Sequence, residues 1–302
     1  MIGGDHSGFG ASLFAEGLLF RSGTEGIYGR SETFQAVVDA IDRLINGWGS
    51  ELSATVINFP PVVARTTFDA TNYLRSFPDL VGSVQAFRGD DRDHAELVRR
   101  LVEGEEWTDL AVPADIVLCP SACHPVYPLC TGSLPDGGRY FDIRGYCFRN
   151  EPSVDPSRMR SFEMHELVFV GDEDSALEHR DCGVARGLEL LGGLGLEVNA
   201  VTANDPFFGR IGRLLATQQA AAGLKIEVVT PLSSDGRPAA VMSANYHRDH
   251  FAMPFGITTP DGATAHSACV GFGLDRIAIA LFRSHGVHPG EWPTSITDHL
   301  WA

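Results

Sequence analysis

The sequence is poor in the features that mark several large classes of protein. Basic residues are scarce, since 23 Lys and Arg stand against 39 Asp and Glu, and the formal net charge is −16. Surfaces that bind a nucleic-acid backbone usually carry an excess of positive charge, so broad engagement of DNA or tRNA is disfavoured. No apolar run approaches the roughly 20 residues that a membrane span needs. Residues Met1–His6 lack the basic and apolar segments of a signal peptide, and we expect none.

Cysteine is also sparse. Six cysteines in 302 residues do not make a disulfide scaffold. We therefore expect a reducing cytoplasm, with some thiols free to bind a metal. The hydrophobic content of 44% is ample for a large core in a chain of this length, organised as one elaborate domain or as two small ones.

Hydrophobic periodicity predicts both helices and strands. Ser31 is placed to cap a helix whose apolar residues run to Ile45, and Gly47 and Gly49 are expected to end it. A strand over Leu52–Phe59 follows, and residues from about 75 to 115 are expected to form helices and loops. Further strands are expected over 116–118, 140–151, 162–170, 224–230, 239–244 and 267–273, and helices over about 174–191, 208–222 and 274–282.

The order of these elements indicates the fold class. Strands rarely alternate singly with helices, so an α+β fold, with an antiparallel sheet flanked by helices, fits better than a doubly wound parallel sheet. The strands over 140–151 and 162–170 form a hairpin whose long polar loop is typical of a functional segment.

This hairpin carries residue types suited to a nucleotide triphosphate. Arg149 and Arg158 can donate paired hydrogen bonds to phosphates, Glu151 can accept from an exocyclic amine, and Phe162 can stack on a purine. Residues two apart in a strand share a face, so Arg149 and Glu151 are expected on one face of the sheet. A solvated hairpin with a surface Arg–Glu pair explains the same spacing about equally well.

A glycine-rich turn stands near the end of the chain. Gly271 and Gly273 begin like a dinucleotide fingerprint, but Arg276 occupies the place of its third glycine, so the Rossmann interpretation fails. Glycines admit a ligand close to the backbone, and an arginine in the first helical turn favours a phosphate. A tight strand-to-helix turn with an exposed arginine is the alternative.

Cysteines and acids form a third set of candidates. Cys119 and Cys123 offer one close pair, and no second pair completes a compact zinc finger. Cys123 and His124 are adjacent and do not normally point at each other, which disfavours a Cys–His nucleophile. Burial as small apolar side chains is the commonest fate of free cysteines.

Taken together, the hairpin and the late turn resemble motifs 2 and 3 of class II aminoacyl-tRNA synthetases. The helix and strand between Ser31 and Pro60 look like motif 1, the dimer-forming element, and the resemblance extends to about His285. It implies a homodimer with a class II synthetase-like antiparallel sheet. The residues that the resemblance assigns to ATP are Arg149 on the α-phosphate, Glu151 on the adenine amino group, Phe162 stacked on adenine, and Arg158 and Arg276 on the terminal phosphates.

A narrower resemblance concerns a metal. Methanogen-type seryl-tRNA synthetases, and the bacterial amino acid:[carrier protein] ligases similar to them, hold zinc in the amino-acid pocket through Cys, Glu and Cys. The matching positions here are Cys123, Glu166 and Cys269, with Cys119 as an alternative to Cys123 and Glu163 as a fallback for Glu166 on the opposite strand face. Three protein ligands leave one position open, as in catalytic zinc sites.

The layout favours the carrier-protein ligases over the tRNA synthetases. The motifs use almost the whole chain, so we expect a single catalytic domain over residues 1–302, with a glycine-rich segment over 1–30 and no tRNA-binding domain. The implied activity is ATP-dependent activation of glycine or alanine and transfer to the phosphopantetheine thiol of a carrier protein. A seryl-type aminoacyl-tRNA synthetase and a non-catalytic synthetase-like binding subunit are the alternatives.

One departure concerns magnesium. Seryl-type enzymes place a carboxylate before motif 3, near a serine, to bind Mg²⁺ between phosphates. If Ser243 is that serine, the position of the acid falls at Ala240, and Glu227 on the preceding strand is the substitute.

Overall fold

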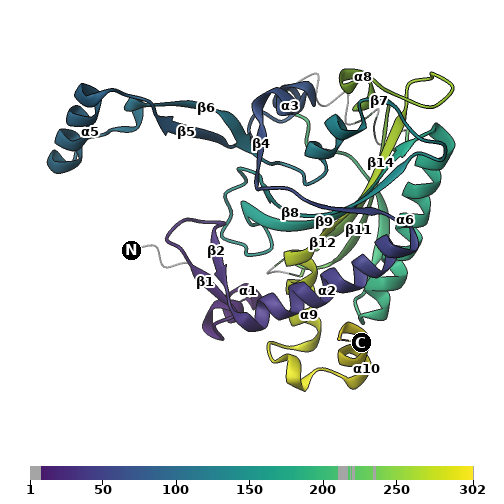
Figure 1. Cartoon of the computed structure of the whole chain (residues 1–302). Helices are drawn as coiled ribbons and strands as arrows, with labels where there is room; N and C mark the ends of the chain where they lie inside the picture. Colours follow the sequence, from purple (N-terminus) through teal and green to yellow (C-terminus); the bar gives the residue numbers. More distant parts are fainter. Residues whose placement is uncertain (1–7, 210–216, 218, 220–221, 234–235, 302) are drawn as a thin grey trace.

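A seven-stranded sheet forms the centre of the molecule (Figure 1). The computed structural model describes residues 8–209, 217, 219, 222–233 and 236–301. Neighbouring strands are antiparallel, except that β3 runs parallel to β8. The expected α+β class with an antiparallel sheet is confirmed. The strands, in spatial order, are β10 (Asn199–Ala203), β11 (Lys225–Pro231), β12 (Pro238–Arg248), β14 (His266–Gly273), β9 (Ser161–Gly171), β8 (Arg139–Phe148) and β3 (Thr55–Asn58).

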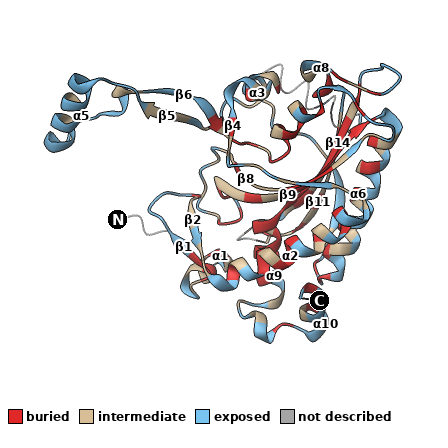
Figure 2. Cartoon of the chain, viewed as in Figure 1, coloured by how far each residue is buried: buried red, intermediate tan, exposed pale blue. Residues whose placement is uncertain are grey.

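Three long helices cover one face of this sheet. They are α2 (Glu32–Glu51), α6 (Glu173–Gly193) and α9 (Leu274–His285), and α10 (Thr294–Leu300) packs against α2. Their apolar sides and the sheet share a buried cluster that includes Phe34, Leu167 and Phe282. Figure 2 shows the burial concentrated along β9, β14 and α9. The helices therefore close one face and leave the opposite face of the sheet for a site.

The helix α2 begins as expected but ends later. The Ser31 hydroxyl accepts a hydrogen bond from the Phe34 N–H at 3.1 Å, which is the expected N-cap. The helix then continues through both glycines to Glu51, so the prediction that Gly47 and Gly49 end it is wrong. A Cβ on Gly49 would lie 2.1 Å from Asp142 Oδ2, whereas one on Gly47 would meet no atom within 4 Å. Gly49 thus permits the close approach of α2 to β8.

A projecting arm spans most of residues 75–115, where helices and loops are expected, and it contains helices together with two strands. It consists of β5 (Ser83–Phe87), α5 (Asp91–Glu103), η1 (Thr108–Leu110) and β6 (Ala111–Leu118), and it joins β4 (Val62–Ala64) in a sheet of order β4-β6-β5. Figure 1 shows the arm extending away from the body. That prediction missed the two strands, because a two-stranded ribbon exposed on both faces lacks clear apolar alternation. Residues 116–118, expected as a strand, are the end of β6.

Two strand boundaries also differ from expectation. The strand expected over Leu52–Phe59 begins only at Thr55, because Ser53 lies in the left-handed region with φ of +54°. The strand expected over 140–151 ends at Phe148. The remaining expected elements are confirmed within a few residues, apart from β12, which extends four residues beyond 244, and the helix over 208–222, which falls mostly outside the described residues.

Among the described helices, none combines the length and apolarity that crossing a membrane requires.

Shorter elements complete the described chain. The shorter elements are α1 (Phe9–Ala15), β1 (Leu19–Arg21), β2 (Tyr28–Arg30), α3 (Arg65–Ala70), α4 (Tyr73–Ser76), η2 (His124–Cys130), β7 (Gly132–Ser133), α8 (Ala252–Phe255), β13 (Ile257–Thr258) and η3 (Pro289–Glu291).

The two glycines of α2 give a matched test of this packing. Gly49→Ala should lower the free energy of unfolding by about 1–3 kcal/mol, because the new methyl group collides with Asp142. Gly47→Ala should raise it by up to about 1 kcal/mol, since alanine favours a helix and has space here. Urea denaturation followed by circular dichroism measures both. Equal effects of the two substitutions would contradict the close approach at Gly49.

Candidate active site

A cavity of about 840 Å³ opens on the sheet face opposite the three long helices. Its floor comes from β9, β11, β12 and β14, and its rim from the loops after β6 and β8. The lining contains every site residue singled out from the sequence, namely Cys123, Arg149, Glu151, Arg158, Phe162, Glu166, Glu227, Cys269 and Arg276. The cavity thus joins segments that lie up to 205 residues apart in the chain, from Thr71 to Arg276.

Strand register orders the floor of the cavity. Glu227 lies opposite Ser243, Ser243 opposite Gly271, and Gly271 opposite Glu166, so these residues form one row across four strands. Because alternate residues of a strand share a face, Cys269 lies on the same face two residues away from Gly271. The absence of a side chain at Gly271 leaves space between Ser243 and Glu166.

Cys123, Glu166 and Cys269 converge at one end of the cavity. One ligand atom from each lies within 4.8 Å of the other two, and all three residues are buried. The Cys269 sulfur is 3.6 Å from Glu166 Oε2, and the Cys123 N–H donates to the same oxygen at 2.7 Å. Two sulfurs bound to tetrahedral Zn²⁺ at about 2.3 Å are about 3.8 Å apart. The group is therefore compact enough to bind a metal ion.

The two alternatives for metal ligands lie elsewhere. The Cys119 thiol donates to the Ser121 carbonyl at 3.0 Å and is not part of the convergent group. Glu163 contacts Arg30 and Arg144 on the helix-covered side of β9, as the alternation of the strand requires. The geometry of the described residues therefore favours Cys123 over Cys119 and Glu166 over Glu163.

The chemistry of this group suits a cation. The hydrogen bond with Cys123, burial and the Glu166 carboxylate together raise the pKa of the Cys269 thiol well above its usual range. The hydrogen bond with Cys269 favours the Cys123 thiolate, but burial and Glu166 outweigh it and raise the pKa of Cys123. A bound divalent cation would reverse both shifts by stabilising the thiolates. Two thiols beside a buried carboxylate are thus a donor set that fits a metal such as zinc.

Ser121 supports this group and was missed by sequence reasoning. Its hydroxyl donates to Glu166 Oε1 at 3.0 Å and lies 3.3 Å from the Cys123 sulfur. The Ala122 N–H also donates to Glu166 Oε1, at 3.3 Å. These bonds fix the Glu166 carboxylate of β9 relative to the loop that follows β6. Serine is common in loops, so the sequence signal for Ser121 is limited to its position two residues before Cys123.

Arg149 connects the end of the cavity that contains Cys123, Glu166 and Cys269 to the rest of the cavity. Arg149 lies just beyond the end of β8 at Phe148, so the expectation that Arg149 and Glu151 share a face of this strand is wrong. Both residues nevertheless line the cavity. The Arg149 N–H still bonds the Arg160 carbonyl at 2.8 Å, and Nε donates to the Pro120 carbonyl at 3.2 Å. Its guanidinium lies 5.5 Å from the centre of the Phe162 ring. The arginine is thus oriented by the loop that bears Cys123.

A surface Arg–Glu pair does form, as in the alternative interpretation of the hairpin, but Glu151 pairs with Arg158 and not with Arg149. Glu151 lies 3.7 Å from Arg158, and the Arg158 side chain is 59% exposed at the rim of the cavity. An exposed pair of this kind contributes little to stability. Arg158 is therefore free to exchange Glu151 for an anionic ligand.

Arg276 lies in the first turn of α9, directly after the glycines of β14. Nε donates to the Ser157 carbonyl and Nη1 to the Ala240 carbonyl, each at 2.9 Å. Burial lowers the pKa of Arg276, and the positive charges of Arg149 and Arg158 lower it further. Three arginines whose charges oppose one another in one cavity form a site for a polyanion.

The far end of the cavity contains a lysine between two carboxylates. Lys225, the only lysine of the chain, has Nζ 2.6 Å from Asp205 Oδ1 and 3.0 Å from Glu227 Oε1. Sequence reasoning missed Asp205 and Lys225, although the uniqueness of Lys225 was a visible signal. Glu227 is therefore held by an ammonium group, opposite Ser243 on the next strand.

Comparisons with known proteins place these features in a wider context. No family model matches the chain. Two proteins of Bradyrhizobium diazoefficiens, amino acid–[acyl-carrier-protein] ligases 1 and 2, are each 40% identical to the chain over 95% of its length, covering 88% and 86% of their own lengths. A type-2 serine–tRNA ligase of Methanothermobacter thermautotrophicus is 25% identical over 80% of the chain and 50% of its own length.

Solved structures agree on the fold. The seryl-tRNA synthetase of M. kandleri, in complex with tRNASec of A. aeolicus, superposes with a TM-score of 0.83 at 22% identity, over 98% of this chain and 60% of that one. The seryl-tRNA synthetase of Pyrococcus horikoshii, complexed with ATP, has a TM-score of 0.69 at 14% identity, over 100% of this chain and 64% of that one. The class II synthetase-like architecture is thereby confirmed.

Replacement of single cysteines separates the metal ligands from their neighbour. Cys123→Ser and Cys269→Ser should each lose most of the bound metal, because a site with two remaining protein ligands binds zinc weakly. Cys119→Ser should retain it, since that thiol donates to the Ser121 carbonyl and lies outside the convergent group. Metal content per chain, measured by plasma mass spectrometry on purified protein, distinguishes them. Metal loss in Cys119→Ser together with retention in Cys123→Ser would reverse the assignment.

Proposed function

Because the chain belongs to the family of the amino acid–[acyl-carrier-protein] ligases, we propose that it activates a small amino acid with ATP and transfers it to a carrier protein. Glycine or alanine is the proposed substrate, and the phosphopantetheine thiol of the carrier is the proposed acceptor. The observation that carries this proposal is the convergence, in one cavity, of an arginine-lined end and the Cys123–Glu166–Cys269 group.

The arginine-lined end is the proposed ATP site. Arg149 contacts the α-phosphate, and Arg158 and Arg276 bind the terminal phosphates of a bent nucleotide. Phe162 stacks on adenine and Glu151 accepts from its amino group. The mutual repulsion of the arginines supports this assignment, because ATP supplies the negative charge that offsets it.

The cysteine end is the proposed amino-acid site, with zinc bound by Cys123, Glu166 and Cys269. When bound, zinc supplies an open coordination position that accepts the substrate amine. Ser121 orients Glu166, and Arg149 is tied to the same loop through Pro120. This linkage supports a fixed distance between the amine and the α-phosphate.

Two covalent steps follow from that placement. A carboxylate oxygen of the amino acid attacks the α-phosphorus, and pyrophosphate leaves with the electrons of the broken P–O bond. The thiolate sulfur of the carrier arm then attacks the acyl carbon, and AMP leaves. Arg149 stabilises the charge that develops on the α-phosphate, while Arg158 and Arg276 bind the departing pyrophosphate. Positioning and electrostatics suffice, and no protein nucleophile takes part.

Magnesium is proposed as the counter-ion of the phosphates, with Glu227 as its protein ligand. Ser243 lies opposite Glu227 in the strand register, which supports their joint action. Ala240 cannot ligate through its side chain, and its carbonyl accepts from Arg276. Lys225 competes for the Glu227 carboxylate, so magnesium binding requires this ion pair to open.

A homodimer is proposed from the motif 1 resemblance. Strand β3 forms an edge of the central sheet, and Val56 on it is 64% exposed. An apolar side chain on an open strand edge supports association through this side of the molecule. The net charge of −16 continues to disfavour tRNA as a partner.

Amino-acid-dependent pyrophosphate exchange tests the proposed function. Exchange should occur with glycine or alanine, and radiolabel should pass to a holo carrier protein and not to tRNA. Label on tRNA without label on the carrier would establish the synthetase alternative. No exchange with any amino acid would establish the non-catalytic alternative.

Substitution of Arg149 tests its role within the reaction. Arg149→Ala should lower kcat of the exchange by about 10²- to 10³-fold, since a preorganised donor to the developing charge is lost. Arg139→Ala, at the start of β8 and outside the lining of this cavity, is the matched control and should leave kcat unchanged. A similar loss in both variants would argue against contact of Arg149 with the α-phosphate.

A further inference from the structure

The β1–β2 hairpin, residues 19–30, precedes the segment that resembles the synthetase motifs, yet it contacts the loop between β8 and β9. The Gly26 carbonyl accepts from the Arg160 N–H at 2.8 Å, and the Tyr28 hydroxyl donates to the Ser153 carbonyl at 3.4 Å. Met159, from the same loop, is buried in one cluster with Leu18 and Leu19. The hairpin therefore supports the loop that carries Arg158.

The last residue of the hairpin, Arg30, reaches two buried carboxylates. Its guanidinium lies 2.5 Å from Glu163 Oε2 and 2.7 Å from Asp275 Oδ1, and donates to Asp275 Oδ2 at 2.8 Å. Asp275 is 2% exposed and Glu163 is 6% exposed. A planar guanidinium that bonds two carboxylates at once fixes their separation.

These carboxylates are the chain neighbours of two proposed ATP ligands. Glu163 follows Phe162 on β9, and Asp275 precedes Arg276 on α9. The Glu163 N–H donates to Asp275 Oδ2 at 2.7 Å, so Asp275 joins β9 directly to the first turn of α9. In a strand, adjacent side chains point to opposite faces. Glu163 therefore anchors the strand from behind, while Phe162 faces the cavity.

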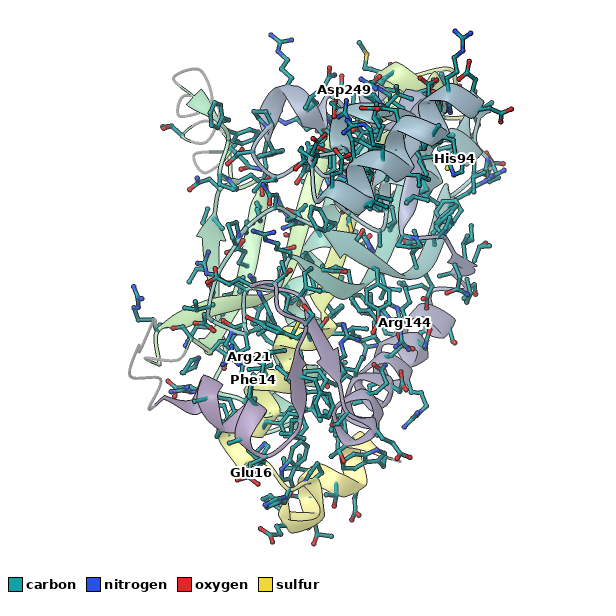
Figure 3. The ribbon with its side chains drawn as sticks, turned by 90° about the vertical axis from the view of Figure 1, so that its left-hand side faces the viewer. Phe14, Glu16, Arg21, His94, Arg144 and Asp249 are labelled. Carbon is teal, nitrogen blue, oxygen red and sulfur yellow. The ribbon has the colours of Figure 1, made fainter. Side chains whose placement is uncertain are left out.

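The hairpin is itself fixed to the body. Arg21 on β1 lies 4.0 Å from the centre of the Phe14 ring on α1, and Figure 3 shows these two side chains together on this side of the molecule. The Phe14 ring packs edge-on against Tyr28 on β2, at 5.1 Å between ring centres. Arg30 is thus held in place from its own side as well as by the carboxylates.

We propose that the β1–β2 hairpin is a positioning element of the ATP site, in which Arg30, through Glu163 and Asp275, sets the spacing between Phe162 and Arg276. This inference rests on the proposed ATP site and adds a segment outside the three synthetase-like motifs. Phe162 and Arg276 contact opposite ends of the nucleotide, so a change in their spacing weakens ATP binding more than amino-acid binding.

Arg30→Met is the principal test. We expect the KM for ATP in pyrophosphate exchange to rise about 10-fold or more, because both carboxylates lose their shared partner and the two ATP contacts shift. The KM for the amino acid and the metal content should stay within about twofold of the wild type. Arg30 contacts Glu163 and Asp275, whereas the Cys123–Glu166–Cys269 group lies at the other end of the cavity. Arg30→Lys keeps the charge without the planar fork and should recover part of the affinity.

Arg144→Met is the matched control. Arg144 belongs to the same network, with contacts to Glu163, Asp39 and Asp42, and within the described part of the chain none of its ion pairs involves Asp275. Its KM for ATP should remain within about twofold of the wild type. Equal increases in both variants, or a parallel change in the KM values for ATP and amino acid, would overturn the proposal.

A milder variant covers the case in which Arg30→Met does not fold. Tyr28→Phe removes only the hydrogen bond to the Ser153 carbonyl and leaves the ion pairs intact. Its KM for ATP should rise about 2- to 5-fold, and an unchanged value would contradict the role of the hairpin. Calorimetry with a non-hydrolysable ATP analogue separates the two levels of the account. Failure of the wild type to bind refutes the ATP site, whereas equal binding by wild type and variants refutes only the hairpin proposal.

Discussion

The alternation of side chains along β9 is the constraint on which the other features depend. Phe162 and Glu166 face the cavity, where the first lies near Arg149 and the second contacts the Cys123 loop. Glu163 and His165 face the helices, where they pair with Arg30 and with Asp42 and Asp142. One strand thereby spaces the two ends of the cavity and anchors the sheet to α2 and α9. The strand is hydrogen-bonded to β14 on one side and to β8 on the other, which fixes its register in the sheet.

The two faces of β9 also differ in how their charged groups are paired. On the cavity side, burial and the positive charges of Arg149 and Arg158 lower the pKa of Arg276, and the hydrogen bond with Cys123, burial and Glu166 raise the pKa of the Cys269 thiol. An anion at the arginine end and a cation at the cysteine end would each offset these shifts. On the helix side the charges are already matched within the protein: burial lowers the pKa of His165, but the hydrogen bonds that its ring donates to Asp142 and Asp42 outweigh burial and raise it. The charges that the fold leaves unmatched therefore lie on the face that we propose binds ligands.

Much of this could be predicted from the sequence because its patterns are local. The strand around Glu166 and the Gly-x-Gly turn before Arg276 follow from local patterns, and the resemblance to class II synthetases supplied the candidate residues at the two ends of the cavity. Features that depend on distant contacts were missed. Glycine typically ends a helix, whereas Gly49 is needed inside α2 for its approach to Asp142. Likewise, Ser121 and Arg30 act through partners 45 and 245 residues away, which no periodicity reveals.

The proposed site combines, in one cavity, a metal-bound amine with an arginine-bound nucleotide. Crystals grown with a non-hydrolysable glycyl-adenylate analogue, with diffraction recorded at the zinc absorption edge, test it most directly. The account predicts one anomalous peak within about 2.5 Å of the sulfurs of Cys123 and Cys269, the ligand amine bound to it, and adenine on Phe162. An absent peak, a peak bound by Cys119, or a nucleotide outside this cavity would contradict the account.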